Sequence, residues 1–315
     1  MKKCPFCAED IQDGAIKYSI YFSGYRGGSH VMGYTGSRAL RKIMIVMACI
    51  AVTAGCANFE KQSRPSVVPD SFPGYLAAGA LPDSEALIPP PPSAGSTALA
   101  LDHDISRNGL TLRDSPRWTL AAEDADLTFP RAAGTFSCAL NAPVTEQDTP
   151  HLYMLMRRTL ADVSLSTSKA KNAFMRTRPF VINRERTCSP NVEQSMMKNG
   201  SYPSGHSAVG WAWALILSEI SPEQADAILA RGRAFGQSRV ICNVHWQSDV
   251  IEGRFIGAAT VARLHADPVF RADLESARSE IAAARAKGLK PVRDCKAEAD
   301  ALAEYPQQAP WPANK

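Results

Sequence analysis

The segment Val209–Ile220 constrains the fold of this chain more than any other, because nearly every residue in it is apolar. A helix that is apolar on all sides has to be buried on all sides, so this segment predicts a central helix surrounded by other helices. No apolar run of about 18 residues, the length needed to cross a bilayer, follows residue 60. The sequence therefore excludes a multi-span membrane protein and predicts a helical core.

Further segments carry helix patterns around this core. Apolar residues recur at helical spacing over 149–167, and residues 250–266 form a second apolar segment. A helix over 221–237 begins with Ser221 as the predicted N-cap, followed directly by proline. Another helix is predicted over 267–287, where a glycine follows as the stop signal.

Alternating strand patterns are nearly absent, so we predict an all-α fold: a single compact helical domain over residues 103–290, followed by a tail over 291–315. The apolar content of 45% and charged content of 21% are typical of globular proteins. The net charge of +4 is too small and too scattered to indicate nucleic acid as a partner. Eight cysteines in 315 residues are too few for a disulfide scaffold.

Residues 38–56 have the pattern of a signal peptide, with basic residues first, then an apolar stretch over 43–53, then small residues. This predicts export, to the periplasm or the medium of a bacterium. Ala54-Gly55-Cys56 resembles the end of a bacterial lipoprotein box, in which the cysteine carries a lipid anchor, although Thr53 stands where leucine is usual. Ordinary cleavage near residues 54–57 and a buried core helix are the alternatives.

Residues 1–37 are predicted to be a disordered leader. Cys4 and Cys7 have the spacing of one zinc-ribbon knuckle, but no second pair follows to complete four ligands, so they form a half-site at most. Met32 would place a start directly before the signal peptide. Residues 57–102 are rich in Pro, Ser and Ala and predict an extended linker that docks locally through Phe72 and Tyr75.

Three separated motifs carry candidate functional groups. Lys171 and Arg178 are seven residues apart, which would place both on one face of a helix that Pro179 ends. Both could then reach one anion. Without the other motifs, however, this pair would indicate only a solvated basic face. We interpret the neighbouring Arg176 as a surface residue.

The second motif is Gly200-Ser-Tyr-Pro-Ser-Gly-His-Ser207, directly before the central helix. A glycine-containing turn at a helix N-terminus presents backbone N–H groups to an anion, and here Ser204 adds a hydroxyl and His206 a titratable proton. On its own, this motif would be better explained as a capped turn with a packed histidine.

The third motif is Ser238-Arg239 followed by His245 and Asp249. Four residues separate the histidine from the aspartate, so on a helix the carboxylate can bind the imidazole. That contact keeps the proton on one ring nitrogen and leaves the other free as a nucleophile.

In this order, Lys-x6-Arg-Pro, Pro-Ser-Gly-His and Ser-Arg-x5-His-x3-Asp resemble the signature of the acid phosphatase and vanadium haloperoxidase superfamily. The wider Gly-Ser-Tyr-Pro-Ser-Gly-His context is similar to the bacterial class A non-specific acid phosphatases, with Ser207 where threonine is usual. The resemblance covers roughly residues 103–285. It implies an all-helical, exported, metal-independent enzyme that hydrolyses a broad range of phosphate monoesters through a phosphohistidine.

The resemblance also implies roles for individual residues. His245 would attack phosphorus, Asp249 would fix its tautomer, and His206 would protonate the leaving oxygen. The phosphate would be held by five residues: Lys171, Arg178, Ser204, Gly205 and Arg239. No cofactor is expected, and vanadate is expected to inhibit. The oligomeric state stays open, a homo-oligomer included.

An exported domain would keep disulfides. We pair Cys188 with Cys242, which follow the first and third motifs, and expect a second bond between Cys138 and Cys295. Two alternative functions remain. A vanadium-dependent haloperoxidase shares the phosphate cradle but is usually much longer, and a non-catalytic phosphate-binding lipoprotein would not need both histidines and Asp249.

Overall fold

The computed structural model describes residues 2–3, 10–11 and 72–304. Near the N-terminus, strands β1 (Lys2–Lys3) and β2 (Asp10–Ile11) pair antiparallel. The chain divides into units over 1–63 and 64–315, and the helical unit is described here by itself. The signal peptide, Cys56, Cys4 and Cys7 lie outside the described residues, so these predictions stay predictions.

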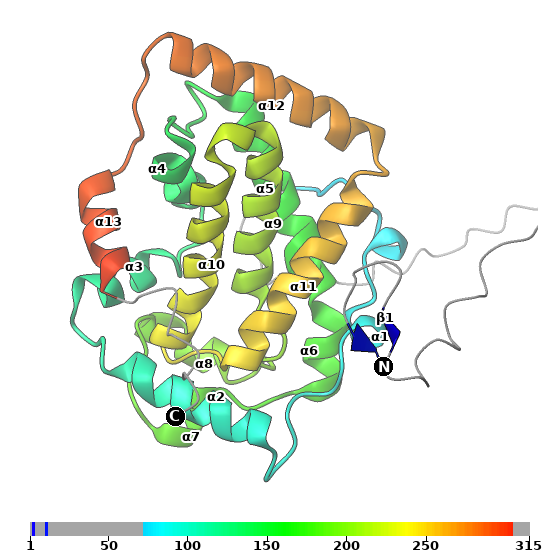
Figure 1. Ribbon diagram of the computed structural model, residues 1–315, viewed down its shortest axis with the longest axis vertical. Coiled ribbons are helices and arrows are strands. Elements are labelled where there is room, and N and C mark those ends of the chain that lie inside the picture. The colour runs from blue at the N-terminus through cyan, green and yellow to red at the C-terminus, as the bar shows by residue number, and fades with distance from the viewer. Residues whose placement is uncertain (1, 4–9, 12–71, 305–315) are drawn as a thin grey trace, which may run out of the picture. The chain divides into compact units, whose positions relative to one another are not determined.

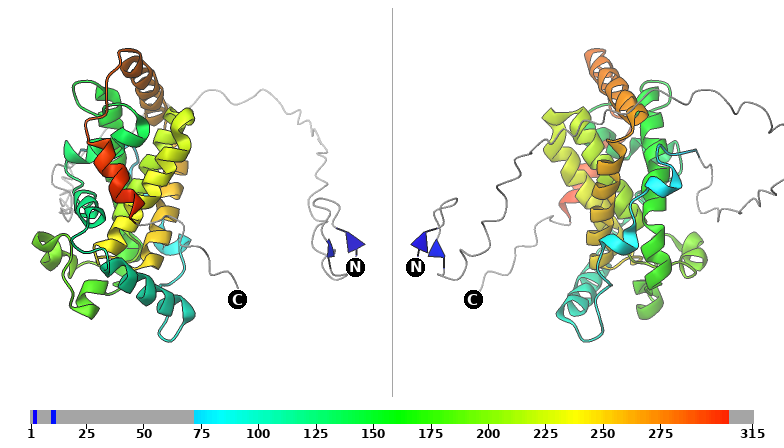
Figure 2. Two further views of the ribbon diagram at one scale, coloured as in Figure 1. Left: turned by 60° about the vertical axis from the view of Figure 1, so that its left-hand side comes forward. Right: turned by 90° about the vertical axis from the view of Figure 1, so that its right-hand side faces the viewer.

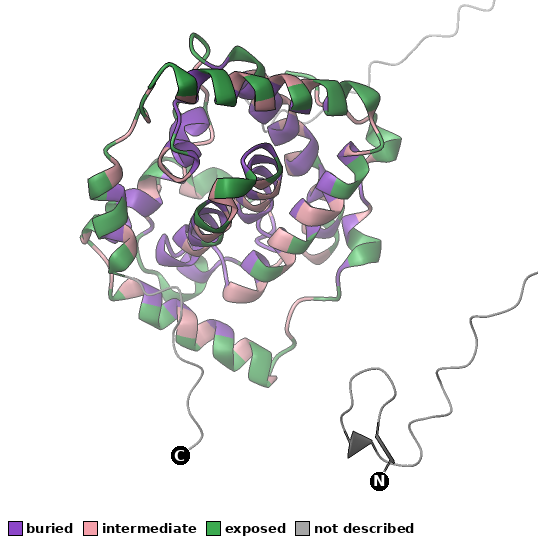
Figure 3. Cartoon of the chain, turned by 45° about the horizontal axis from the view of Figure 1, so that its top comes forward, coloured by how far each residue is buried: buried purple, intermediate pink, exposed green. Residues whose placement is uncertain are grey.

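The helical unit is built around α9 (Gly205–Ile220), the predicted central helix. Helices α5 (Pro150–Ser166), α10 (Ala225–Ile241) and α11 (Gln247–Leu264) pack against it (Figure 1). Trp213 of α9 is fully buried and donates its indole N–H to the Met156 carbonyl of α5 at 3.1 Å. Figure 3 shows the buried residues concentrated on these inner helices. The all-α prediction is confirmed.

Helix α12 (Pro268–Ala286) packs on α5, at the end of the unit opposite to α2 (Thr97–Leu110) (Figures 1 and 2). The predicted helix over 221–237 begins with the 3-10 turn η5 (Pro222–Gln224) and continues as α10. Ser221 does not cap it, because its hydroxyl donates to the Glu223 carboxylate instead. Within residues 72–304, no helix is long and apolar enough to cross a membrane.

The predicted linker over 57–102 is wrong from residue 72 onward. The backbone N–H groups of Tyr75 and Leu76 donate to the Asp162 carboxylate of α5 at 2.8 and 3.0 Å. A 3-10 turn η2 (Ala78–Ala80) and α1 (Ser84–Leu87) follow, and α2 begins at residue 97 with Ser96 as its N-cap. The predicted docking through Tyr75 is therefore confirmed. Segments on both sides of the proline run fold as part of the domain, which begins earlier than residue 103.

The predicted C-terminal tail over 291–315 is also wrong in part. Residues 295–303 form α13 (Cys295–Ala303), which Asp294 caps and which packs on α3 (Pro116–Glu123). The Cys138–Cys295 disulfide ties α13 to α4 (Ser137–Leu140), with 5.4 Å between the Cα atoms. The Cys188–Cys242 disulfide also forms, at a Cα–Cα distance of 4.8 Å.

The remaining elements are short and connect the main helices. They are η3 (Arg131–Phe136), α6 (Ser168–Phe174), α7 (Pro179–Asn183), η4 (Pro190–Val192) and α8 (Glu193–Met196).

Candidate active site

The ends of several helices meet at the predicted site. Helix α10 ends at Ile241 and α11 begins at Gln247, and both ends lie in the lower half of Figure 1. The N-terminus of α9 joins them, because the backbone N–H of Ser204 donates to the Asp249 carbonyl at 2.8 Å. The loop from α6 to α7 contributes the remaining groups.

His245 and Asp249 form the contact that their spacing predicts. The imidazole Nδ1 lies 3.2 Å from Asp249 Oδ2, and both side chains are buried. Since a carboxylate only accepts hydrogen bonds, Nδ1 carries the proton and Nε2 keeps its lone pair. Arg178 Nη1 lies 3.1 Å from this Nε2 and donates to it. His245 precedes α11 and Asp249 lies in its first turn, so the two are not on one continuous helix.

Lys171 and Arg178 are also not on one helix, contrary to the prediction. Met175 adopts a left-handed φ of 42° and ends α6, and Arg178 precedes α7, in which Pro179 is the first residue. The two cations still converge, because both donate to the carbonyl of Gly200, at 3.0 Å from Lys171 and 3.4 Å from Arg178. The loop, not a helix face, brings them together.

Arg239, in the last turn of α10, completes a group of three cations with Lys171 and Arg178. Arg178 and Arg239 are each less than 10% exposed. Within residues 72–304, none of the three has a carboxylate within ion-pair distance. Buried positive charges without an anion are costly, so the cluster favours binding of an anionic group.

The turn before α9 supplies the other predicted residues. Ser204 is the N-cap of α9, since its hydroxyl oxygen accepts the backbone N–H of Ser207 at 3.2 Å and keeps its own proton to donate. Gly205 faces Lys171, whose Cε would lie 3.8 Å from an added Cβ. His206 Nε2 lies 3.0 Å from the carbonyl of Ala125, so Nε2 carries a proton and Nδ1 is the nitrogen left to exchange one.

The electrostatics of the cluster lower the pKa of each basic group. Burial, followed by Arg178, lowers the pKa of Lys171 to about 7, and burial lowers that of Arg178 to about 10. Burial and then Arg178 lower the pKa of Arg239 to about 9. Burial and the neighbouring cations also hold the pKa of His206 and His245 well below the ordinary histidine value. Both histidines are therefore neutral near neutral pH.

Arg176 is not a surface residue, as the sequence had suggested. Its side chain is 9% exposed and its guanidinium donates to Asp249 Oδ1 at 2.7 Å and to Asp102 Oδ2 at 2.8 Å. Asp102 comes from α2, at the predicted linker boundary. No sequence pattern marks the Asp102–Arg176 pair, because its members are 74 residues apart.

A second buried ion pair lies behind Ser238 and was also missed. Arg231 of α10 pairs with both oxygens of Asp124, which accepts the Ser238 hydroxyl at 2.7 Å. Ala125, the residue after Asp124, is the one whose carbonyl binds His206. This network therefore supports two motif positions from the side of α3.

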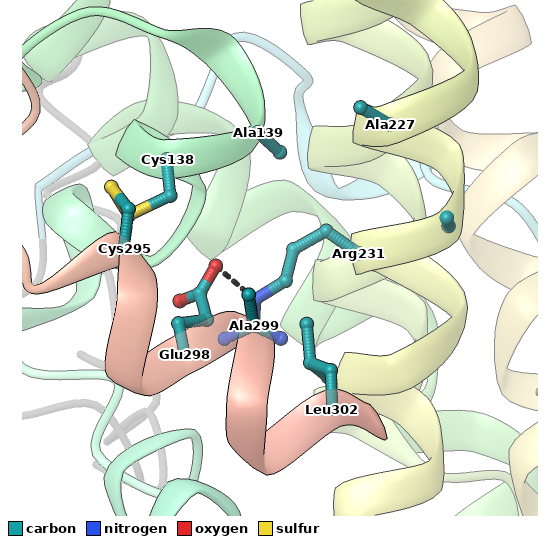
Figure 4. A pocket seen from close by; sticks show the side chains of 9 residues that line it. Cys138, Ala139, Ala227, Arg231, Cys295, Glu298, Ala299 and Leu302 are labelled. Atoms are coloured by element: carbon teal, nitrogen blue, oxygen red, sulfur yellow. Dashed lines mark ion pairs between the residues drawn. A yellow bond between two sulfur atoms is a disulfide. The ribbon is translucent and has the colours of Figure 1, made fainter. Parts of the chain in front are cut away.

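A cavity of about 270 Å³ lies beside this network and contains none of the predicted site residues (Figure 4). Arg231 and Glu298 both line it and form an ion pair, with 3.4 Å between Nε and Oε1. The Cys138–Cys295 disulfide lines one side. Within the described residues, no three His, Cys, Asp or Glu side chains are grouped as a metal site.

Comparison with known proteins gives consistent matches. Residues 151–272 match the model of the PAP2 superfamily. A non-specific acid phosphatase of Providencia stuartii is 45% identical over 215 residues, which cover 68% of this chain and 86% of that protein. A non-specific acid phosphatase of Salmonella typhimurium is 44% identical over 63% of this chain and 80% of that protein. An acid phosphatase of Zymomonas mobilis is 40% identical over 64% of this chain and 76% of that protein.

Proposed function

Because this chain belongs to the PAP2 superfamily, among its bacterial non-specific acid phosphatases, we propose that it hydrolyses phosphate monoesters through a phosphohistidine on His245, without a metal ion. The observation that carries the proposal is the group of three cations around His245, with no carboxylate at ion-pair distance in the described chain. Arg178 and Arg239 are buried, Lys171 is partly buried, and Arg178 contacts the Nε2 of His245. Such a group can bind a phosphate dianion and stabilise the charge on its equatorial oxygens in the transition state.

In the first half-reaction, the lone pair of His245 Nε2 forms a bond to phosphorus as the phosphorus–oxygen ester bond breaks. His206 gives the proton from Nδ1 to the leaving oxygen, so an alcohol departs and a phosphohistidine remains. Its low pKa in the empty site would rise when the dianion binds, since the anion offsets the neighbouring Arg239 and Lys171.

In the second half-reaction, neutral His206 removes a proton from water, and the water oxygen forms a bond to phosphorus. The phosphorus–nitrogen bond breaks and its electron pair returns to His245, which releases phosphate. Asp249 would hold the Nδ1 proton throughout and stabilise the positive charge on the ring. The three cations take the place of a metal ion, which supports metal independence.

The substrate range is proposed to be broad, because the predicted site residues address the phosphate and not the alcohol. The signal-peptide pattern over 38–56 and the two disulfides support export to the periplasm or the medium, with a lipid anchor at Cys56 as one route. Vanadate is proposed as an inhibitor, because its trigonal-bipyramidal complex resembles the transition state.

The test measures release of a chromogenic alcohol from its phosphomonoester in the presence of a chelator. Wild type should remain active, and quenching in alkaline detergent during turnover should trap label from the phosphate on His245, because the phosphorus–nitrogen bond survives in alkali and is hydrolysed in acid. The His245→Ala variant should lose turnover and labelling but still bind inorganic phosphate, since the cations are unchanged. Loss of wild-type activity to the chelator, with recovery on adding zinc, would contradict the proposal.

A further inference from the structure

Arg176 lies directly behind the carboxylate of Asp249, on the side away from His245. Asp249 Oδ2 accepts the imidazole Nδ1–H at 3.2 Å and the backbone N–H of Trp246 at 2.9 Å. Asp249 Oδ1 accepts from Arg176 Nη1 at 2.7 Å. The arginine therefore occupies the one carboxylate oxygen that the histidine does not use.

Other groups fix the position of Arg176 in turn. Its Nη2 donates to Asp102 Oδ2 at 2.8 Å, and its Nη1 also donates to the Ser248 hydroxyl at 2.7 Å. The backbone N–H of Ser248 donates to the other Asp102 oxygen at 2.8 Å. The rings of Tyr202 and Trp246 lie 6.0 and 5.4 Å from the guanidinium, which leaves it largely dry.

The charge on Asp249 depends on this arrangement. Burial raises the pKa of the Asp249 carboxyl, and Arg176 is the largest influence that lowers it again. The charged and titratable groups that act on His245 and Asp249 come from α6, the α6–α7 loop, α9 and α10: Lys171, Arg176, Arg178, His206 and Arg239. Asp102 of α2 acts through Arg176. All those acting most strongly on His245 are cations. Without an ionised Asp249, the imidazole would have no anionic partner.

We propose that Arg176 and Asp102 are positioning residues of the phosphatase reaction: their ion pair fixes the Asp249 carboxylate and, through it, the orientation and tautomer of His245. This inference rests on the proposed function. It makes α2 part of the reaction machinery, because Asp102 holds Arg176 from that helix. Asp102 contacts Arg176, Arg176 contacts Asp249, and Asp249 contacts His245. Of these four residues, only His245 would touch the substrate.

The first test is Arg176→Gln, measured as kcat and KM against pH. Removing the cation favours the protonated form of Asp249, and that protonated fraction grows as the pH falls. We expect kcat to fall roughly 10- to 100-fold, by analogy with the loss seen when the outer partners of metal-binding histidines are removed, with a larger loss at pH 5 than at pH 8. KM should change little, because the phosphate-binding cations remain. An equal loss at every pH would overturn the proposal.

Coupling to Asp249 separates positioning from general damage. In an Asp249→Asn background, Arg176→Gln should cause almost no further loss of kcat, because the carboxylate on which it acts is already neutral. Full additivity of the two losses would overturn the proposal. The matched control is Arg158→Gln, which breaks an ion pair with Asp273 on the α5–α12 side and should leave the pH profile unchanged. Arg176→Lys restores the charge and should restore the wild-type shape of the profile at a lower kcat.

Asp102→Asn keeps the test decisive if Arg176→Gln does not fold. The amide preserves the size of the side chain, and its oxygen can still accept the backbone N–H of Ser248. The charge behind Arg176 and the oxygen that accepts from Arg176 are lost. We expect a smaller loss of kcat than in Arg176→Gln, and again a larger loss at pH 5 than at pH 8. A wild-type profile would overturn the part assigned to Asp102.

A readout without turnover distinguishes failure of this inference from failure of the proposed function. Nitrogen NMR of labelled histidine should show His245 protonated at Nδ1 in wild type and a mixture of tautomers in Arg176→Gln at acidic pH. An unchanged tautomer in the variant would overturn the positioning role even if the wild type is an active phosphatase. A wild type without phosphatase activity would remove the proposed function, and the tautomer measurement would still decide the role of Arg176.

Discussion

The pKa of Lys171 leads to a prediction for anion binding. Burial and the neighbouring Arg178 lower the pKa of this lysine from 10.5 to about 7 in the empty site. A bound anion favours the protonated lysine and moves its pKa back toward the ordinary value. Above pH 7 most molecules therefore have to take up a proton in order to bind, and the affinity should fall as the pH rises.

The size of the effect follows from the same value. With a pKa of about 7, the lysine is protonated in about nine-tenths of molecules at pH 6 and in about one-tenth at pH 8. If the lysine is fully protonated in the complex, the dissociation constant rises about tenfold over this range, or roughly 1.4 kcal/mol. Arg178 and Arg239, with pKa values of about 10 and 9, stay largely charged up to pH 8.

The assay is calorimetric titration with sulfate, whose own charge does not change between pH 6 and 8. Lys171→Arg replaces the lysine by a group that stays charged, so it should lose this tenfold dependence whatever its absolute affinity. Any dependence that remains in the variant belongs to His206 and His245. The matched control is Lys169→Arg on the same helix, because Lys169 is exposed and paired with Asp83.

The result that would refute this reasoning is an equal change of affinity with pH in wild type and Lys171→Arg. The lysine would then be charged throughout, and the buried cations would not perturb one another as strongly as their proximity indicates. Repeating the titration in buffers of different ionisation enthalpy adds a direct count of protons taken up. Wild type at pH 8 should take up nearly one proton more than the variant.

The main helices and the members of the site could be predicted from the sequence because each depends on local information. Apolar spacing determined the positions of α5, α9, α11 and α12, since a helix in a packed core has to bury one face or all of them. The four-residue spacing from His245 to Asp249 predicted their contact correctly, even though the histidine precedes the helix.

The remaining errors concern contacts that local patterns do not encode. The spacing of Lys171 and Arg178 suggested a continuous helix, but the left-handed backbone at Met175 interrupts it. Methionine rarely adopts this conformation, so the sequence does not indicate the turn. Arg176 was predicted to be a surface residue because the signature of the family does not use it. Its partner Asp102 lies at the edge of a segment whose composition indicated a linker. Outside a ligand site, buried charged residues are usually paired, and sequence reasoning that considers one partner at a time predicts both to be exposed.

Two predictions concern stability. Replacing Cys138 by serine removes the bond to Cys295, which closes a loop with a sequence separation of 157. The variant should unfold at a Tm roughly 5–15 °C lower than wild type in calorimetry. An unchanged Tm would mean that packing alone holds α13. Asp124→Asn should lower the free energy of unfolding in urea by about 3 kcal/mol at pH 7, because it leaves the buried Arg231 without its main partner. Burial raises the pKa of Asp124, but the charge of Arg231 opposes this and holds the pKa below its ordinary value. The stability from this pair is therefore present above the ordinary aspartate pKa and is lost as the pH falls through the folded one, so the difference between wild type and variant should shrink in acid. The half-exposed Asp126 provides the control, and equal effects of Asp124→Asn and Asp126→Asn would contradict the assignment of a buried ion pair.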